Sequence, residues 1–185
     1  MIPGFIISIL TFPGVIVHEL AHQICCKICG VVVYQAKYFQ FQNPCGYVIH
    51  ENVTNPWKNL CMALGPFFFN TIIGMLIASV PAFCIMGDGE MMYQNNPLMS
   101  ALNIVLLWLG ISILMHAFPS IGDAKSLVKT VVDNREVGTF ARCITLPFVG
   151  LIYLGAAGSV IWLDLIYGVA MSMLLPNLMS SILYR

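Results

Sequence analysis

The chain has 185 residues, of which 59% are apolar and only 9% are charged. Because soluble domains carry about 25% charged residues, this composition leaves too little polar surface for a water-facing globule and excludes a soluble enzyme of ordinary design. Eight Lys and Arg balance eight Asp and Glu, so the chain has no basic excess with which to hold nucleic acid. We therefore expect a protein of the lipid bilayer with no nucleic-acid partner.

Five apolar stretches are long enough to cross a bilayer, which takes about 20 residues of helix. They cover residues 5–28, 60–86, 98–118, 146–163 and 165–183. The predicted fold class is an all-α polytopic membrane protein with about five transmembrane helices. We expect one domain over residues 1–185, with a catalytic core at about 5–133 and a C-terminal helical hairpin at about 144–185. The apolar N-terminus lacks the positive region of a signal peptide, so we expect it to be retained.

The charged residues and the cysteines indicate how the chain is oriented. With the N-terminus outside, five spans place all eight Lys and Arg on one face, which the positive-inside rule makes cytoplasmic. Seven cysteines in a chain of this kind are expected to be free thiols in a reducing compartment. The alternative for three of these cysteines is a role as metal ligands or lipid attachment sites: Cys25, Cys26 and Cys29. A compact chain without accessory domains indicates a prokaryotic plasma membrane.

The segment between the first two spans does not have a helical pattern. Residues 31–34 are β-branched and aromatic, residues 38–42 alternate polar with aromatic, and turn-forming residues at 43–46 precede another apolar run at 47–49. We expect a small β-hairpin or sheet on the inner membrane face, with a plain structural connector as the alternative. Beyond the third span, a short amphipathic helix is expected over 123–133.

The first span contains the sequence His18, Glu19, Leu20, Ala21, His22. Residues four apart share one helical face, so both imidazoles can reach one metal ion while Glu19 approaches its open position. An ionisable group inside the bilayer costs at least about 2.5–3.5 kcal/mol, and metal ligation offsets that cost. The alternative is that interhelical hydrogen bonds or an ion pair satisfy these three side chains.

A catalytic zinc ion takes three protein ligands and leaves the fourth position to water. Asp123 is the candidate for the third ligand, because Pro119 and Gly122 break the third helix and let the backbone turn toward the site. Asp123 could instead only cap the following helix. The other His and acidic side chains near this face are His50, Glu51, His116, Asp133 and Glu136.

In their order along the chain, three motifs resemble the site-2 protease family of intramembrane zinc metalloproteases. They are the HExxH helix at residues 18–22, a Gly-Pro-x-x-x-Asn element with Asn70 at its end, and an Asp-containing helix break at residues 119–123. The resemblance covers about residues 10–130. It implies one Zn²⁺ per chain held by His18, His22 and Asp123, with Glu19 as the catalytic carboxylate and Asn70 as a substrate contact. For Asn70, an interhelical hydrogen bond is the alternative.

The resemblance implies hydrolysis of a peptide bond in or near a transmembrane segment of a membrane-protein substrate. A catalytically silent, metal-binding module of the same fold that binds a partner is the alternative. A metal transporter is a third class, but it would need acidic or His residues spread across the bilayer, and the last two predicted spans have only Asp164, at their outer turn.

Overall fold

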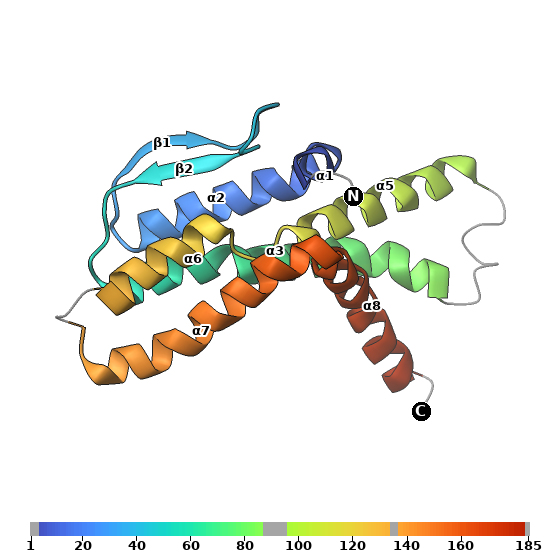
Figure 1. Ribbon diagram of the computed structural model, residues 1–185. Coiled ribbons are helices and arrows are strands. Elements are labelled where there is room, and N and C mark those ends of the chain that lie inside the picture. Colours follow the sequence, from blue (N-terminus) through green and yellow to red (C-terminus); the bar gives the residue numbers. More distant parts are fainter. Residues whose placement is uncertain (1–3, 87–95, 134–136, 184–185) are drawn as a thin grey trace.

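Helices account for most of the chain that the computed structural model describes, which is residues 4–86, 96–133 and 137–183 (Figure 1). The elements are α1 (Gly4–Leu10), α2 (Phe12–Ile28), β1 (Val33–Lys37), β2 (Tyr47–His50), α3 (Pro56–Met86), α5 (Pro97–Met115), α6 (Ile121–Val128), α7 (Thr139–Gly158) and α8 (Leu163–Leu183). A π-helical turn, Lys129–Asp133, follows α6. The predicted fold class, helical with a small sheet between the first two spans, is confirmed at this level.

Among the described residues, three helices are long and apolar enough to cross a membrane: α3, α5 and α8. A fourth span is present if α1 and α2 are counted together. The apolar part of α7, Arg142–Gly155, is shorter than the other spans. The expected five spans are therefore confirmed only in part, and a crossing by α7 stays a prediction.

The first predicted span is not one continuous helix. α1 and α2 are bent by 92° at Thr11, whose backbone is not helical. Proline has no backbone N–H and clashes with the preceding turn, so Pro13 ends the first helix and suits the first turn of the next. α2 alone has 17 residues, about 26 Å at 1.5 Å per residue, slightly less than the hydrocarbon thickness of about 30 Å.

The spanning helices pack on one another and keep apolar side chains on their outer faces. α3 contacts α2, α5 and α8, and α5 contacts α2 and α8. On α3, exposed apolar residues recur every four positions, as one stripe along the helix: Phe68, Ile72, Leu76 and Val80. Such a stripe is stable against lipid chains, since it needs no polar cover.

Strands β1 and β2 form an antiparallel hairpin that lies along α2 (Figure 1). Val48 pairs with Ala36 and Tyr47 with Lys37. The prediction that residues 38–42 belong to a strand is wrong, because this segment lies in the connection between β1 and β2. There the Gln40 side chain donates to the Pro44 carbonyl (2.8 Å), which closes the connection on itself.

Candidate metal centre

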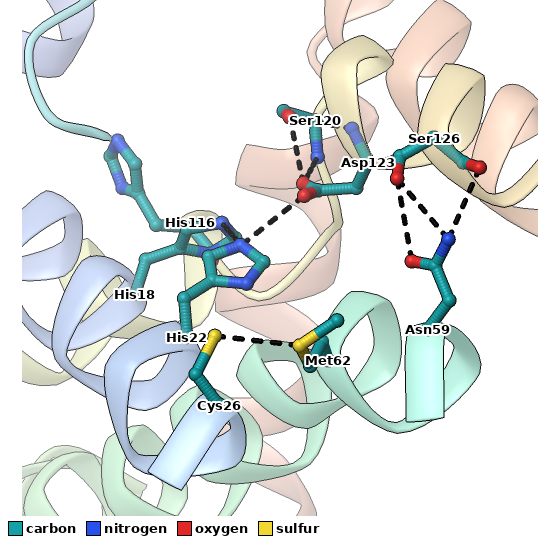
Figure 2. Close-up of polar contacts among 9 residues, drawn as sticks. All are labelled: His18, His22, Cys26, Asn59, Met62, His116, Ser120, Asp123 and Ser126. Carbon is teal, nitrogen blue, oxygen red and sulfur yellow. Dashed lines mark hydrogen bonds and ion pairs between the residues drawn. The ribbon is translucent and has the colours of Figure 1, made fainter. Parts of the chain in front are cut away.

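His18 and His22 lie one turn apart on α2 and point to the same side of the helix (Figure 2). Their Nε2 atoms are 3.1 Å apart. The His18 ring is buried, whereas that of His22 is partly exposed. The spacing of four residues therefore brings both imidazoles together, as the sequence predicted.

Asp123 reaches the two histidines from α6. The chain leaves α5 after Met115, passes Pro119 and starts α6 at Ile121. This turn brings Asp123 Oδ1 to 3.5 Å from His22 Nε2. The three ligand atoms all lie within 4.8 Å of one another, and no other group of His, Cys or acidic residues that the structure describes meets this condition. The three candidate ligands thus lie close enough to one another to hold a single metal ion.

The carboxylate of Asp123 has two separate environments (Figure 2). Oδ2 accepts hydrogen bonds from the backbone N (2.8 Å) and Oγ (2.7 Å) of Ser120, and the Ser120 hydroxyl in turn accepts from the Asp123 N–H. This capping box at the start of α6 leaves Oδ1 directed at His22. Helix capping and metal ligation are therefore compatible roles of the same side chain.

The surroundings of Asp123 favour the ionised form of its carboxyl group. Burial by itself would raise the pKa of its carboxyl group, but the neighbouring His22, His18 and Ser120 outweigh that effect and hold this pKa well below its usual range. A metal ion needs the deprotonated carboxylate, so the site presents Asp123 in the form that binds.

The orientation of the His18 ring is fixed by the end of α5. His18 Nδ1 lies 2.7 Å from the carbonyl oxygen of His116. Because a carbonyl only accepts hydrogen bonds, Nδ1 carries the proton and Nε2 keeps its lone pair for the site. A histidine that binds metal through one ring nitrogen usually donates a hydrogen bond from the other, and this hydrogen bond fixes the tautomer.

A close contact between α2 and α5 supports this hydrogen bond. One turn before His18, the Gly14 N–H donates to Ser112 Oγ (3.1 Å), and the Ser112 hydroxyl donates to the Thr11 carbonyl (2.8 Å). A Cβ atom at Gly14 would lie only 2.0 Å from the Ser112 carbonyl oxygen. Glycine is therefore required at this crossing, which sets the distance between His18 and His116.

Asn70 is completely buried and lies behind the histidines. Its Nδ2 lies 3.4 Å from the Gly14 carbonyl, 3.2 Å from that of Ile113 and 3.0 Å from that of His116. Its Oδ1 is buried without a hydrogen-bond partner among the described residues. These contacts favour the interhelical alternative, in which Asn70 joins α3 to α2 and α5. A direct substrate contact of Asn70 stays a prediction.

Glu19 faces a cavity of about 950 Å³ that it shares with the three candidate ligands. The connection between the strands borders this cavity at Gly46, where a Cβ atom would lie 2.7 Å from Glu19 Cγ. Cys45 joins this connection to α1, because its thiol donates to the Phe5 carbonyl (3.9 Å). The hairpin therefore forms part of the wall of the cavity beside Glu19.

The donor set suits a zinc ion. Two imidazole nitrogens and one carboxylate oxygen are ordinary zinc ligands, and three protein ligands leave a fourth position open, as in catalytic sites. The open side is the cavity that contains Glu19. The ion-pair alternative also remains, since His22 and Asp123 satisfy each other in part without a metal.

The other candidate ligands are placed differently. His50 borders the same cavity, but its Nδ1 is hydrogen-bonded to the Glu51 carbonyl (2.8 Å), and neither residue belongs to the cluster. The His116 ring is hydrogen-bonded to the Ser112 carbonyl (3.0 Å). The side chain of Asp133 and all of Glu136 lie outside the described residues.

Three groups that build this site are not among the residues predicted from the sequence. Ser120 could have been found, because Ser followed by an acidic residue three positions later is a capping-box pattern. Gly46 was assigned only to a turn, without its contact to Glu19. The His116 carbonyl has no sequence signal, since every residue has a carbonyl.

Comparisons of the chain with protein-family models, with curated proteins and with solved structures found no match.

Proposed function

We propose that this chain is an intramembrane zinc metalloprotease similar to the site-2 proteases. The observation that carries the proposal is the convergence of His18, His22 and Asp123 from two separate helices, with Glu19 on the wall of the adjoining cavity. An HExxH pattern alone gives two ligands and a carboxylate. The third ligand and the space for a peptide support the catalytic function.

Each group has a role in the proposed hydrolysis. A bound zinc ion supplies Lewis-acid polarisation of the scissile carbonyl and lowers the pKa of its water toward about 7. Glu19 accepts a proton from the attacking water and delivers it to the leaving amine. The His116 carbonyl and Ser120 hold His18 and Asp123 in position, so little reorganisation is needed before the chemical step.

The proposed substrate is a transmembrane segment of another membrane protein. A helical peptide bond is shielded and internally hydrogen-bonded, so it must unwind before a water molecule can attack it. The hairpin has two strands, and each leaves one edge unpaired among the described residues. An unwound substrate can pair with such an edge near the cavity.

The proposed active site opens to the cytoplasm, and the proposed location is a prokaryotic plasma membrane; the distribution of charge bears on the first of these proposals. Lys27 is near the C-terminal end of α2, Lys58 is at the start of α3 and Arg142 is at the start of α7. These three helix ends lie on the same side of the molecule (Figure 1). Clustered positive charge favours the cytoplasmic side of a membrane.

A cleavage assay tests the proposal. The full chain is reconstituted in liposomes with single-span membrane proteins tagged at both ends, and wild type is compared with Glu19→Gln. We expect cleavage by wild type, no cleavage by Glu19→Gln and the same zinc content in both. Glu51→Gln removes a carboxylate outside the cluster and should cleave like wild type. Zinc retained without a difference in cleavage between wild type and Glu19→Gln would instead favour a silent partner-binding module.

A further inference from the structure

Thiol groups gather where the end of α2 meets the start of α3. Cys25 and Cys29 are one turn apart at the end of α2. The Cys29 thiol lies 4.0 Å from the Lys58 carbonyl, and the Cys25 thiol lies against Gly65. Cys61 lies between these two positions of α3, three residues from one and four from the other, so it shares their helical face toward α2. The next residue along each helix adds another sulfur, because the Cys26 thiol donates to Met62 Sδ (3.4 Å; Figure 2). All these cysteines are free thiols.

Exposure divides these thiols into two groups. Cys25 and Cys26 are buried, and Cys25 Sγ occupies the space that a Cβ atom at Gly65 would fill. Cys29 is partly exposed and Cys61 is exposed. Cys29 and Cys61 therefore form the pair that faces across two packed helices and is open to a reagent.

The residues around this pair are typical of the membrane surface. Lys27, Trp57 and Lys58 are all exposed within a few positions of the two thiols. The Cys29 thiol also lies 4.0 Å from the Lys58 carbonyl, at the first turn of α3. Lysine and tryptophan concentrate at the boundary between lipid and water, so oxidants from either phase can reach the pair.

We propose that Cys29 and Cys61 are a reversible disulfide site that a hydroperoxide oxidises. The Cys61 thiolate attacks the terminal oxygen of the hydroperoxide, the O–O bond breaks, and an alcohol leaves after taking up a proton. The Cys29 sulfur then attacks the resulting sulfenic acid; the S–S bond forms, the S–O bond breaks and water leaves. Two thiols lose two electrons and two protons, and the hydroperoxide is reduced to an alcohol and water.

The disulfide would close the segment that carries both strands. β1 begins at Val33, shortly after Cys29, and β2 ends at His50, before α3 and Cys61. The bond would join the two ends of the hairpin segment and attach α2 covalently to α3. This proposal concerns the thiols alone and does not depend on proteolysis.

Peptide mapping of the full-length protein tests the site. The reduced protein in detergent is treated with cumene hydroperoxide, the remaining thiols are blocked with N-ethylmaleimide, and the digest is analysed by mass spectrometry. We expect one intramolecular link between Cys29 and Cys61, a mass loss of about 2 Da for two hydrogens, and reversal by dithiothreitol. Cys29→Ser and Cys61→Ser should each lose this link. Cys143→Ser, which removes an exposed thiol on α7, should keep it.

Three results would overturn the proposal: oxidation of the thiols without any intramolecular link, a link from Cys61 to Cys25, or a link from Cys61 to a second molecule. The wild-type map decides among these results even if a serine variant fails to fold.

Discussion

Replacing Gly14 with alanine tests whether the contact between α2 and α5 positions the metal centre. A Cβ atom at this position would lie 2.0 Å from the Ser112 carbonyl oxygen, which is backbone and cannot rotate away. Side-chain carbons essentially never approach closer than 3.0 Å, so the helices must separate by about 1 Å. Forced overpacking of this kind typically destabilises a protein by about 1–3 kcal/mol.

The same movement weakens the hydrogen bond that orients His18. The distance from His18 Nδ1 to the His116 carbonyl is 2.7 Å, and a separation of about 1 Å would lengthen it to as much as about 3.7 Å, beyond hydrogen-bonding range. Loss of such a partner typically reduces metal affinity by about 10–100-fold. We therefore expect Gly14→Ala to bind zinc at least about tenfold more weakly than wild type.

A competition titration with a chromophoric zinc chelator measures this effect on purified protein in detergent. Gly150→Ala is the matched control, because a Cβ atom at Gly150 in α7 meets nothing within 4 Å. That variant should keep wild-type zinc affinity, and its helix should gain up to about 1 kcal/mol from the alanine. Equal zinc affinity and equal unfolding free energy for Gly14→Ala and wild type would refute the reasoning.

Three further substitutions test other parts of the site. Asn70→Leu should lower the free energy of unfolding by about 1–3 kcal/mol in a denaturant titration, because its amide joins three backbone carbonyls; an unchanged value would leave only a substrate role for Asn70. Gly46→Ala should slow cleavage while zinc content stays constant, because the new Cβ displaces Glu19; wild-type cleavage would contradict this. Ser120→Ala removes the hydroxyl that donates to Asp123 Oδ2 and keeps the backbone donor, so it should weaken zinc binding about tenfold, with Ser120→Thr restoring it. Unchanged zinc binding in Ser120→Ala would show that this hydroxyl does not support the metal site.

The part of the site that depends on local geometry could be predicted from the sequence. His18 and His22 share a face because of their spacing within one helix, and this spacing is visible in the sequence. Asp123 was a harder prediction, since it depends on the chain turning back after α5. The Pro119 break and the acidic residue after it were sufficient to identify the candidate.

The break in the first span was missed because hydropathy alone defined that span. Residues 5–28 are apolar almost throughout, so hydropathy does not distinguish the two helices that meet near Pro13. The consequence is structural, since α1 turns by 92° and borders the cavity at Phe5 and Ser8. A proline inside an apolar run is a reason to expect two helices rather than one.

Contacts made by packing could not be predicted from one sequence. The His116 carbonyl reaches His18 only because Gly14 lets two helices approach closely. The position of Cys29 opposite the start of α3, which carries Cys61, likewise depends on how α2 packs on α3. Both contacts join residues far apart in the chain, and no spacing rule links them.

Zinc K-edge absorption spectroscopy on the purified, zinc-loaded protein tests most directly whether His18, His22 and Asp123 hold the ion. We expect one zinc per chain, with two imidazoles and only nitrogen or oxygen ligands at about 2.0–2.2 Å, and loss of this ion in Asp123→Asn. Sulfur ligands at about 2.3 Å, or a spectrum that is the same in wild type and Asp123→Asn, would contradict this expectation.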